Sequence, residues 1–395
     1  MTTATATAVA VPSTTSPLAR LHELRQKLNT VFPERRDVID GSLYALLSGE
    51  HVLLLGPPGT GKSALVRALA ATFSAPYFEQ LLTKFSTPEE LFGPISLRAL
   101  EQDRYARVLT GKLPEAVLAF VDEIFKGNSA ILNSLLSLVN ERVFHNDGQA
   151  VRCPLITLFG ASNELPEGKE LEALFDRFLL RFNVDYLLRP SNFRAVVAGG
   201  EPLSAVSLSL SELEQAQAAS RAVTITDATY DALIQIRDAC NAQGLQASDR
   251  RWKKTLKAVQ ASAYLAGETT TTPEDLMLLS HALWREPKDR SKVAQLVGQF
   301  ADPISSQATE ILDAARETAA RVAGLSSTAD RKTYVGSAAQ ALDELRAQKD
   351  KLTILSKSAG PRARTTIADS EQEISQLHAE LARVISGALQ RGGLR

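Results

Sequence analysis

The chain has 395 residues, of which 44% are hydrophobic and 23% are charged, and its formal net charge is −1. This length predicts two or three domains, and the nearly neutral charge argues against a protein whose whole surface binds nucleic acid. Two cysteines, Cys153 and Cys240, without a CxxC pair favour a reducing compartment over a disulfide framework or a zinc cluster. No apolar run approaches the roughly 18 residues that a membrane-spanning helix needs, so we expect a cytoplasmic protein without a membrane span.

The N-terminal stretch, residues 1–17, consists mainly of Thr, Ala, Ser and Val and has no cationic start. This composition predicts a disordered tail rather than a signal peptide. Residues 18–28 and 38–47 then show the apolar spacing of two helices. Val38 and Ile39 open the second helix, where they either line an adenine pocket or belong to the ordinary core.

The most informative stretch is residues 52–63, in which a four-residue apolar strand leads into a glycine-rich loop. The loop fills every fixed place of the pattern G-x-x-x-x-G-K-[ST] and consists of Gly56, Pro57, Pro58, Gly59, Thr60, Gly61, Lys62 and Ser63. Glycines let the backbone turn its N–H groups toward a polyphosphate, and the helix expected at 64–73 begins at the same point. In this arrangement Lys62 reaches the β- and γ-phosphates, and Ser63 ligates Mg²⁺.

An insertion is expected after the next strand, at residues 76–82. Thr87 begins a capped helix that stops at Gly93, before a proline. Residues 95–112 then hold two short apolar stretches separated by four polar residues. This pattern predicts a hairpin inserted in the region of the second helix, either with a contact role or as a plain surface feature.

Residues 117–123 combine five apolar residues with two acids, as a buried parallel strand does when it ends at a ligand-facing edge. Asp122 is expected to hold Mg²⁺, directly or through water. The adjacent Glu123 is expected to polarise the attacking water as a general base.

A second polar strand end follows a helix at 130–141 and a hairpin at 143–153, which an Asn-Asp-Gly turn indicates. Residues 155–159 predict another buried strand, and Asn163 lies just beyond it, at the same edge as Asp122. Asn163 orients the attacking water, touches the γ-phosphate, or only caps a helix.

The rest of the chain shows one further strand, expected at 184–187, and then helical spacing alone. The helical stretches are 210–220, 227–242, 249–265, 273–285, 304–323, 328–357 and 364–390. Arg250, at the start of the third stretch, either belongs to a solvated face or reaches back toward phosphate.

This order of motifs resembles that of the AAA+ ATPases of the MoxR group, most closely the RavA-like subfamily. The resemblance is carried by residues 56–63, 121–124, 135–144, 160–163 and 176–178, while residues 248–254 and 283–284 favour the RavA-like branch. It covers roughly residues 18–290. The implied fold is an α/β AAA+ phosphate-loop core at 18–200 with a parallel sheet between helices, an all-α lid at 201–290, and a C-terminal α-helical arm or bundle at 291–395.

The resemblance also implies roles for single residues. Lys62 and Ser63 belong to Walker A, Asp122 and Glu123 to Walker B, Asn163 is sensor 1, Arg177 is the arginine finger for a neighbouring subunit, and Arg250 is sensor 2, with Arg251 as the competing choice. The implied cofactors are ATP and Mg²⁺.

Such proteins assemble as hexameric rings, remodel protein clients and often work with a partner that bears a von Willebrand factor A domain. The D-x-S-x-S metal motif of that domain is missing from this sequence, so such a partner is expected to be a separate protein. RavA-like proteins can carry a β-rich insert in the helical arm, whereas no β pattern follows residue 300 here.

Two other functions remain open. A DNA-acting AAA+ motor would need a DNA-binding module or a strongly basic face, and the sequence shows neither, so a nucleic-acid partner is not expected. A nucleotide-gated scaffold would bind ATP without needing its turnover. A GTPase is not expected, since the sequence has no N-K-x-D motif.

Overall fold

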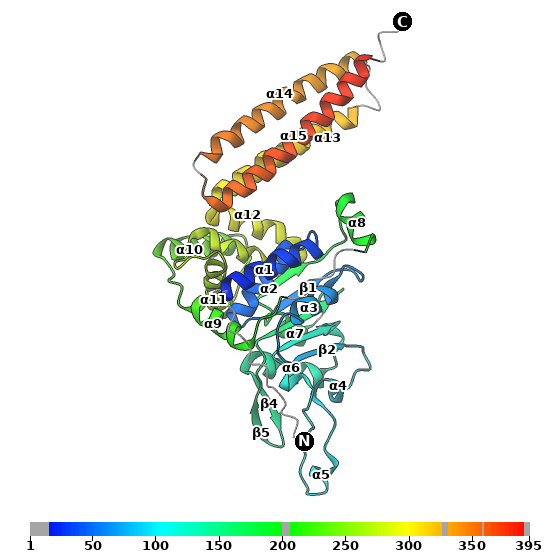
Figure 1. Cartoon of the computed structure of the whole chain (residues 1–395), viewed down its shortest axis with the longest axis vertical. Helices are drawn as coiled ribbons and strands as arrows, with labels where there is room; N and C mark the ends of the chain where they lie inside the picture. Colours follow the sequence, from blue (N-terminus) through cyan, green and yellow to red (C-terminus); the bar gives the residue numbers. More distant parts are fainter. Residues whose placement is uncertain (1–15, 167, 200–205, 326–330, 358, 391–395) are drawn as a thin grey trace, which may run out of the picture. The chain divides into compact units, whose positions relative to one another are not determined.

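The computed structural model describes residues 16–166, 168–199, 206–325, 331–357 and 359–390, and the chain divides into two compact units (Figure 1). The first unit comprises the chain to residue 226 together with 247–271, and the second comprises 227–246 and 272–395. The tail expected at 1–17 lies outside the described residues up to residue 15. The expected domain border at 200/201 and the helix start expected at 328 also lie outside them.

A five-stranded parallel sheet forms the centre of the first unit, which confirms the α/β class. Its strands are β1 (Val52–Leu55), β2 (Tyr77–Leu81), β3 (Leu118–Asp122), β6 (Thr157–Ser162) and β7 (Leu180–Asn183), in the order β2-β3-β6-β1-β7. All residues of β1 and β6 are buried, as expected for central strands covered on both faces.

Helices surround this sheet. They are α1 (Pro17–Val31), α2 (Arg36–Ser48), α3 (Lys62–Ala70), α4 (Pro88–Phe92), α5 (Leu97–Leu100), α6 (Ser129–Glu141), α7 (Lys169–Phe175), α8 (Pro190–Val197), α9 (Leu210–Arg221) and α11 (Asp249–Leu265), with short 3-10 turns at Leu113–Glu115 and Ile124–Lys126. The sequence did not predict α8. Helices α1, α2, α9 and α11 pack on one another, and the stripe of leucines predicted for α1 faces this contact with Leu21, Leu24 and Leu28 fully buried.

The insertion at 95–112 differs from the predicted hairpin. Its two arms do pair antiparallel, through a bridge between Ile95 and Arg107, but the tip between them is the helix α5 rather than a turn. Ser96 explains the helix, because its hydroxyl caps it by accepting a hydrogen bond from the N–H of Ala99. Gly93 starts the insertion at φ 87°, where a Cβ would lie 1.8 Å from the carbonyl oxygen of Val108.

The second hairpin is present as predicted, with strands β4 (Val143–Asn146) and β5 (Gln149–Arg152). Asp147 and Gly148 both have positive φ, at 53° and 73°, which is the conformation of a type I′ turn. By contrast, the last strand was predicted at 184–187 and lies at β7. The buried Arg181 interrupts the apolar residues of β7. A search for a continuous run of apolar residues therefore does not find this strand.

The second unit contains helices throughout its described residues. They are α10 (Asp227–Ala242), the 3-10 segments η3 (Pro273–His281) and η4 (Pro287–Asp289), α12 (Arg290–Ala301), α13 (Pro303–Leu325), α14 (Arg331–Ser356) and α15 (Pro361–Gln390). The stretch predicted as a helix at 273–285 is thus shorter and of 3-10 type, and α12 was not predicted.

Three long helices, α13, α14 and α15, run side by side in this unit (Figure 1). Small side chains fill much of their shared core, which includes the fully buried Ala308, Ala315, Ala338, Ala341 and Ala363. These alanines let the helices approach closely, and the expected helical arm is therefore a three-helix bundle. Within the described part of the chain, no helix combines the length and apolar character that a membrane crossing requires.

Candidate active site

The glycine-rich loop lies between the end of β1 and the start of α3, as the sequence predicts. Gly56, Gly59 and Gly61 have φ values of 143°, 78° and 86°, which side-chain-bearing residues rarely adopt. At Gly56 a Cβ would also lie 2.3 Å from the carbonyl oxygen of Val184, the residue after β7. The loop therefore needs glycine both for its backbone conformation and for its close approach to the sheet.

Lys62 is the first residue of α3, and its side chain folds back over the loop. Its Nζ donates hydrogen bonds to the carbonyl oxygens of Gly56 and Pro57, at 2.7 and 2.8 Å. Burial lowers the pKa of Lys62, while the nearby carboxylates of Asp122 and Glu123 oppose this shift. The ammonium group is thus held between the loop carbonyls and two acids, at a helix N-terminus that favours anions.

The acidic pair lies at the carboxyl end of β3. The Asp122 carboxylate accepts a hydrogen bond from the N–H of Glu123 at 3.0 Å, and Glu123 itself has the left-handed φ of 53°. The Oε2 atom of Glu123 is buried and has no hydrogen-bond donor among the described residues. Lys126 Nζ lies 3.2 Å from it, a distance typical of an ion pair but without hydrogen-bond geometry.

The end of β6 joins these two features at one edge of the sheet. Because β6 lies between β1 and β3, its last residue, Ser162, is paired with Leu55 just before the loop. The N–H of Gly56 donates to the Ser162 carbonyl at 3.1 Å. Asn163 follows directly and is exposed. The parallel order therefore brings the loop, Asp122 and Asn163 to the same edge.

The two residues considered for the adenine pocket are less accessible. Val38 is 5% exposed and Ile39 is fully buried. Ile39 therefore contributes to the core of the unit, and Val38 lies at its rim. A role in lining an adenine remains a hypothesis for both residues.

The segment between α7 and β7 carries a cluster of arginines around Asp176. Its carboxylate lies 3.8 Å from Arg177 and 3.9 Å from Arg181. Arg181 is 1% exposed and its guanidinium lies 3.9 Å from the centre of the Phe175 ring. Arg177 is more accessible, at 19%, and its Nε atom has no hydrogen-bond partner among the described residues.

The two arginines at the start of α11 are used differently. Arg251 is 4% exposed and donates to Asp176 and to main-chain carbonyls around it. Arg250 is exposed. Burial, and then the positive charge of Arg250, lower the pKa of Arg177. The two guanidinium groups are therefore close enough to repel each other. The sequence left the choice between these two arginines open, and the contacts of Arg251 were not predicted.

A signal for Arg251 was nevertheless present in the sequence. Arg251, Thr255, Ala258 and Ser262 follow each other at helical spacing, and all four are buried on α11. A charge at the head of an otherwise small, buried stripe indicates a paired arginine rather than a solvated one. The sequence favoured a solvated face for the charges of this helix start, and Asp249, Arg250 and Lys253 are indeed exposed, whereas Arg251 is buried.

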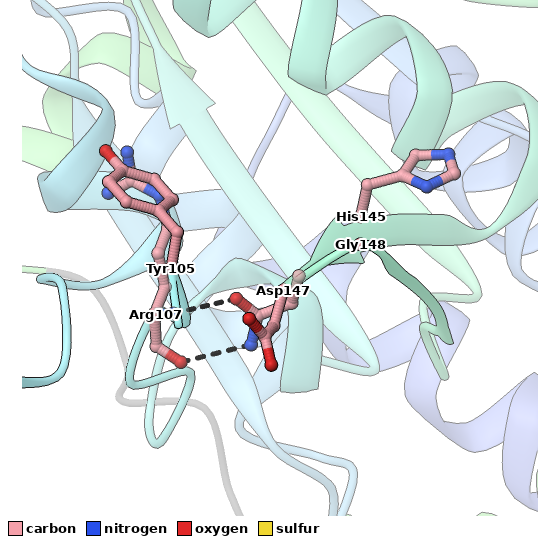
Figure 2. A pocket seen from close by; sticks show the side chains of 6 residues that line it. Tyr105, Arg107, His145, Asp147 and Gly148 are labelled. Carbon is pink, nitrogen blue, oxygen red and sulfur yellow. Dashed lines mark hydrogen bonds between the residues drawn. The ribbon is translucent and has the colours of Figure 1, made fainter. Parts of the chain in front are cut away.

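A second polar site joins the insertion to the β4–β5 hairpin. A pocket of about 280 Å³ is lined by Tyr105, Arg107, His145, Asn146, Asp147 and Gly148. Figure 2 shows two hydrogen bonds across it, from the N–H of Arg107 to Asn146 Oδ1 at 2.7 Å and from Asn146 Nδ2 to the Arg107 carbonyl at 3.1 Å. Arg104 adds an ion pair with Asp147 at 2.7 Å.

The residues present fit a magnesium-bound nucleoside triphosphate. Gly59 and Gly61, both with positive φ, leave open space where side chains would stand. The Lys62 ammonium, the partly exposed Ser63 hydroxyl and the Asp122 carboxylate supply the cation and oxygen ligands that phosphates and Mg²⁺ require. Oε2 of Glu123, which accepts no hydrogen bond from the described residues, adds a proton acceptor at the same edge.

This strand order and this loop define a phosphate-loop nucleotide-binding domain. The family model described as the MoxR domain in the MoxR-vWA-beta-propeller ternary systems matches residues 19–221, and that of the AAA lid domain matches residues 228–297. The chain therefore belongs to the MoxR family of AAA+ ATPases and carries an AAA lid.

Relatives support the same family. The chain is 42% identical to the uncharacterized protein MJ0812 of Methanocaldococcus jannaschii over 292 residues, which are 73% of this chain and 78% of that protein. The uncharacterized protein MJ0079 of the same organism is 41% identical over 75% of this chain and 77% of its own length. Protein MoxR of Paracoccus denitrificans is 29% identical over 44% of this chain and 52% of its own length.

A solved structure shares the fold. It is a crystal structure of a protein from Cytophaga hutchinsonii described as an ATPase, with a TM-score of 0.58 and 17% identity over 72% of this chain and 94% of that one. At this identity the likeness concerns the fold alone.

Proposed function

We propose that this protein hydrolyses ATP and uses the energy to remodel protein clients as a homo-hexameric ring. The observation that carries the proposal is Oε2 of Glu123, a buried carboxylate atom that accepts no hydrogen bond from the described residues and has only the ion pair with Lys126, at the sheet edge where the phosphate loop lies. A carboxylate oxygen with this free acceptor capacity next to a phosphate cradle is poised to accept a proton from water. A site that only bound nucleotide would not need this group.

Each side chain at the edge has a role in this proposal. Residues 56–61 offer backbone N–H groups to the phosphates and Lys62 offers its ammonium. Ser63 and Asp122 hold Mg²⁺, which neutralises charge on the phosphates when bound. Glu123 takes the proton of the attacking water, while Asn163 orients that water. Arg177 serves the site of the neighbouring subunit, and Arg250 serves its own.

The proposed partners follow from the family. The description of the matched model favours a system with a separate von Willebrand factor A domain protein and a β-propeller protein. Residues 248–254 support a finer placement in the RavA-like subfamily, although in the described residues after 300 the chain has only helices. We place the protein in the cytoplasm, with a protein client and no nucleic-acid partner.

The alternatives have less support. A DNA-acting motor would require a basic surface, whereas the chain carries 44 basic and 45 acidic residues. A nucleotide-gated scaffold is the stronger alternative, since it would use the same cradle. Only turnover separates it from the proposed motor.

Two substitutions test the proposal. Lys62→Ala should abolish ATP binding, because it removes the cation of the cradle. Glu123→Gln should keep ATP binding and reduce turnover about 10²–10⁴-fold, the usual contribution of a general base. Binding is measured with a fluorescent ATP analogue, and turnover by phosphate release.

The matched control is Glu141→Gln, which changes an exposed acid at the end of α6 and should leave both quantities unaltered. Turnover by Glu123→Gln near the wild-type rate would refute the assignment of the base. ATP binding without measurable wild-type turnover, with or without client, would favour the scaffold. Affinity capture with Glu123→Gln held in ATP then identifies the client.

A further inference from the structure

We propose that Arg251 is a positioning residue, which holds the segment 176–179 in place and thereby orients Arg177 toward the nucleotide of the neighbouring subunit. This inference rests on the proposed function, since it assigns a residue to the same hydrolysis. It also separates the two arginines at the start of α11: Arg251 acts through Arg177, and Arg250 is left to reach phosphate within its own subunit.

Arg251 donates five hydrogen bonds to this segment. Its Nη1 donates to the carbonyl of Leu179 at 2.9 Å. Its Nη2 donates to the carbonyls of Asp176 and Phe178, at 2.8 and 3.1 Å. Nε and Nη2 also reach the Asp176 carboxylate, at 3.3 and 3.1 Å. All three nitrogens of the guanidinium therefore bind the residues on either side of Arg177.

The geometry of this binding is specific to arginine. A planar guanidinium with five donors can hold a carboxylate and several carbonyls at once, whereas a lysine ammonium cannot reproduce that fork. Because Arg251 is 4% exposed, these hydrogen bonds are shielded from water. To touch a phosphate, Arg251 would have to break them and leave the half-buried Asp176 carboxylate without this partner. It is therefore unsuited to be sensor 2.

The charges explain why Arg177 needs such support. The Asp176 carboxylate is shared, since Arg177 and Arg181 lie 3.8 and 3.9 Å from it in addition to Arg251. Burial, and then the charge of Arg250, lower the pKa of Arg177, so the charged form of this side chain is less stable here than in water. Its Nε lacks a partner among the described residues. A cation held in this way gains from an anion supplied by another subunit.

The second end of the connection is the helix itself. Lys254 lies one turn after Arg251 on α11 and pairs with Glu50 at 2.6 Å, just before β1. The head of α11 is thus tied both to the strand that leads into the phosphate loop and to the segment of Arg177. A shift of α11 would move Arg177 through Arg251. The position of a subunit's own α11 would thereby control how its Arg177 reaches the nucleotide of the neighbouring subunit.

Mixed rings test the inference. Arg251→Gln should bind ATP normally but turn it over about 10²-fold more slowly, since a misplacement of about 1 Å can cost that much. In rings mixed with Glu123→Gln subunits, which cannot hydrolyse but still lend a well-placed Arg177, the Arg251→Gln sites should recover turnover. Arg250→Gln is the matched control and should not recover, because its defect lies within its own subunit.

The outcomes are distinct. Recovery in mixed rings supports the inference, whereas no recovery for Arg251→Gln in verified mixed rings would overturn it in favour of a role within the subunit. Should Arg251→Gln fail to fold, Arg251→Lys and Asp176→Asn take its place with the same expectation. Hydrogen exchange of the amides of 177–180 should rise in these variants without nucleotide. An absence of ATP turnover in the wild-type protein would instead refute the proposed function on which the inference rests.

Discussion

His51, directly before β1, is fully buried. The N–H of Leu158 donates to its Nδ1 at 2.9 Å, and its Nε2 lies 2.6 Å from Nη1 of Arg142 and 3.2 Å from the Val139 carbonyl oxygen. Burial above all, and then the charges of Arg142 and Lys254, hold the pKa of His51 well below its usual range. The neutral ring therefore contacts both β6 and α6 from the start of β1.

This burial predicts a loss of stability in mild acid. The folded-state pKa lies below the unfolded value of about 6.5, so below that pH the unfolded chain binds a proton that the folded chain does not. The contribution is complete above pH 6.5 and is lost as the pH falls toward the folded-state pKa, by up to about 1.4 kcal/mol per pH unit. Urea unfolding between pH 5 and 7 measures this slope.

His51→Gln keeps a polar side chain at this position and should flatten the dependence on pH. The control is His145→Gln at the exposed hairpin, which should leave the dependence as in the wild type. An unchanged slope in His51→Gln would show that other groups cause the acid sensitivity.

The insertion and the β4–β5 hairpin form one connected element. Figure 1 shows α5 and the hairpin at the same end of the first unit. The paired hydrogen bonds between Arg107 and Asn146 join their backbones, and Arg104 pairs with Asp147 at the tips. Leu97 and Tyr105 are 75% and 59% exposed beside this junction. We propose that this end faces the pore of the ring and that Arg104 or Tyr105 touches the client.

The element can be tested without touching the nucleotide site. Replacing residues 101–104 by a short Gly-Ser turn should leave basal ATP turnover within about twofold and remove its stimulation by client, because the exposed tip and its link to the hairpin are lost. The measurement is phosphate release with and without the captured client. Asp147→Asn, which weakens only the ion pair, should reduce stimulation less. Full stimulation in the Gly-Ser variant would exclude the tip from client handling.

The elements show where sequence patterns succeed. The phosphate loop, β3 with its acids and the type I′ hairpin were predicted because their signals are local: glycines, an apolar run, an Asn-Asp-Gly turn. The position of β7 was not, because Arg181 is charged but buried by contacts with Phe175 and Asp176. The contacts of Arg251 were missed for a similar reason, since its partner Asp176 lies 75 residues earlier in the sequence.

At the scale of the assembled molecule, the proposed trans role of Arg177 can be separated from its other contacts. Arg177→Ala should bind nucleotide but lose about 10³–10⁵-fold in turnover, the usual contribution of an arginine finger. Lys62→Ala cannot bind nucleotide but still carries Arg177. Mixed rings of the two should regain part of the wild-type turnover at interfaces where the second variant lends its arginine to the first.

The control mixes Arg177→Ala with the double variant Lys62→Ala/Arg177→Ala, which should regain nothing. An absence of recovery in verified mixed rings of the single variants would favour a cis or purely structural role. Arg181 is a poor substitute for the finger, because it is 1% exposed and stacks on Phe175.

The left-handed backbone conformation of Glu123, the proposed general base, lowers the stability of the folded protein. A side chain in this conformation costs about 1–2 kcal/mol, and glycine would relieve most of that cost. Selection for heat resistance alone would thus favour Glu123→Gly, which removes the proposed general base. Engineering of a more stable variant of this protein should therefore measure ATP turnover at every round.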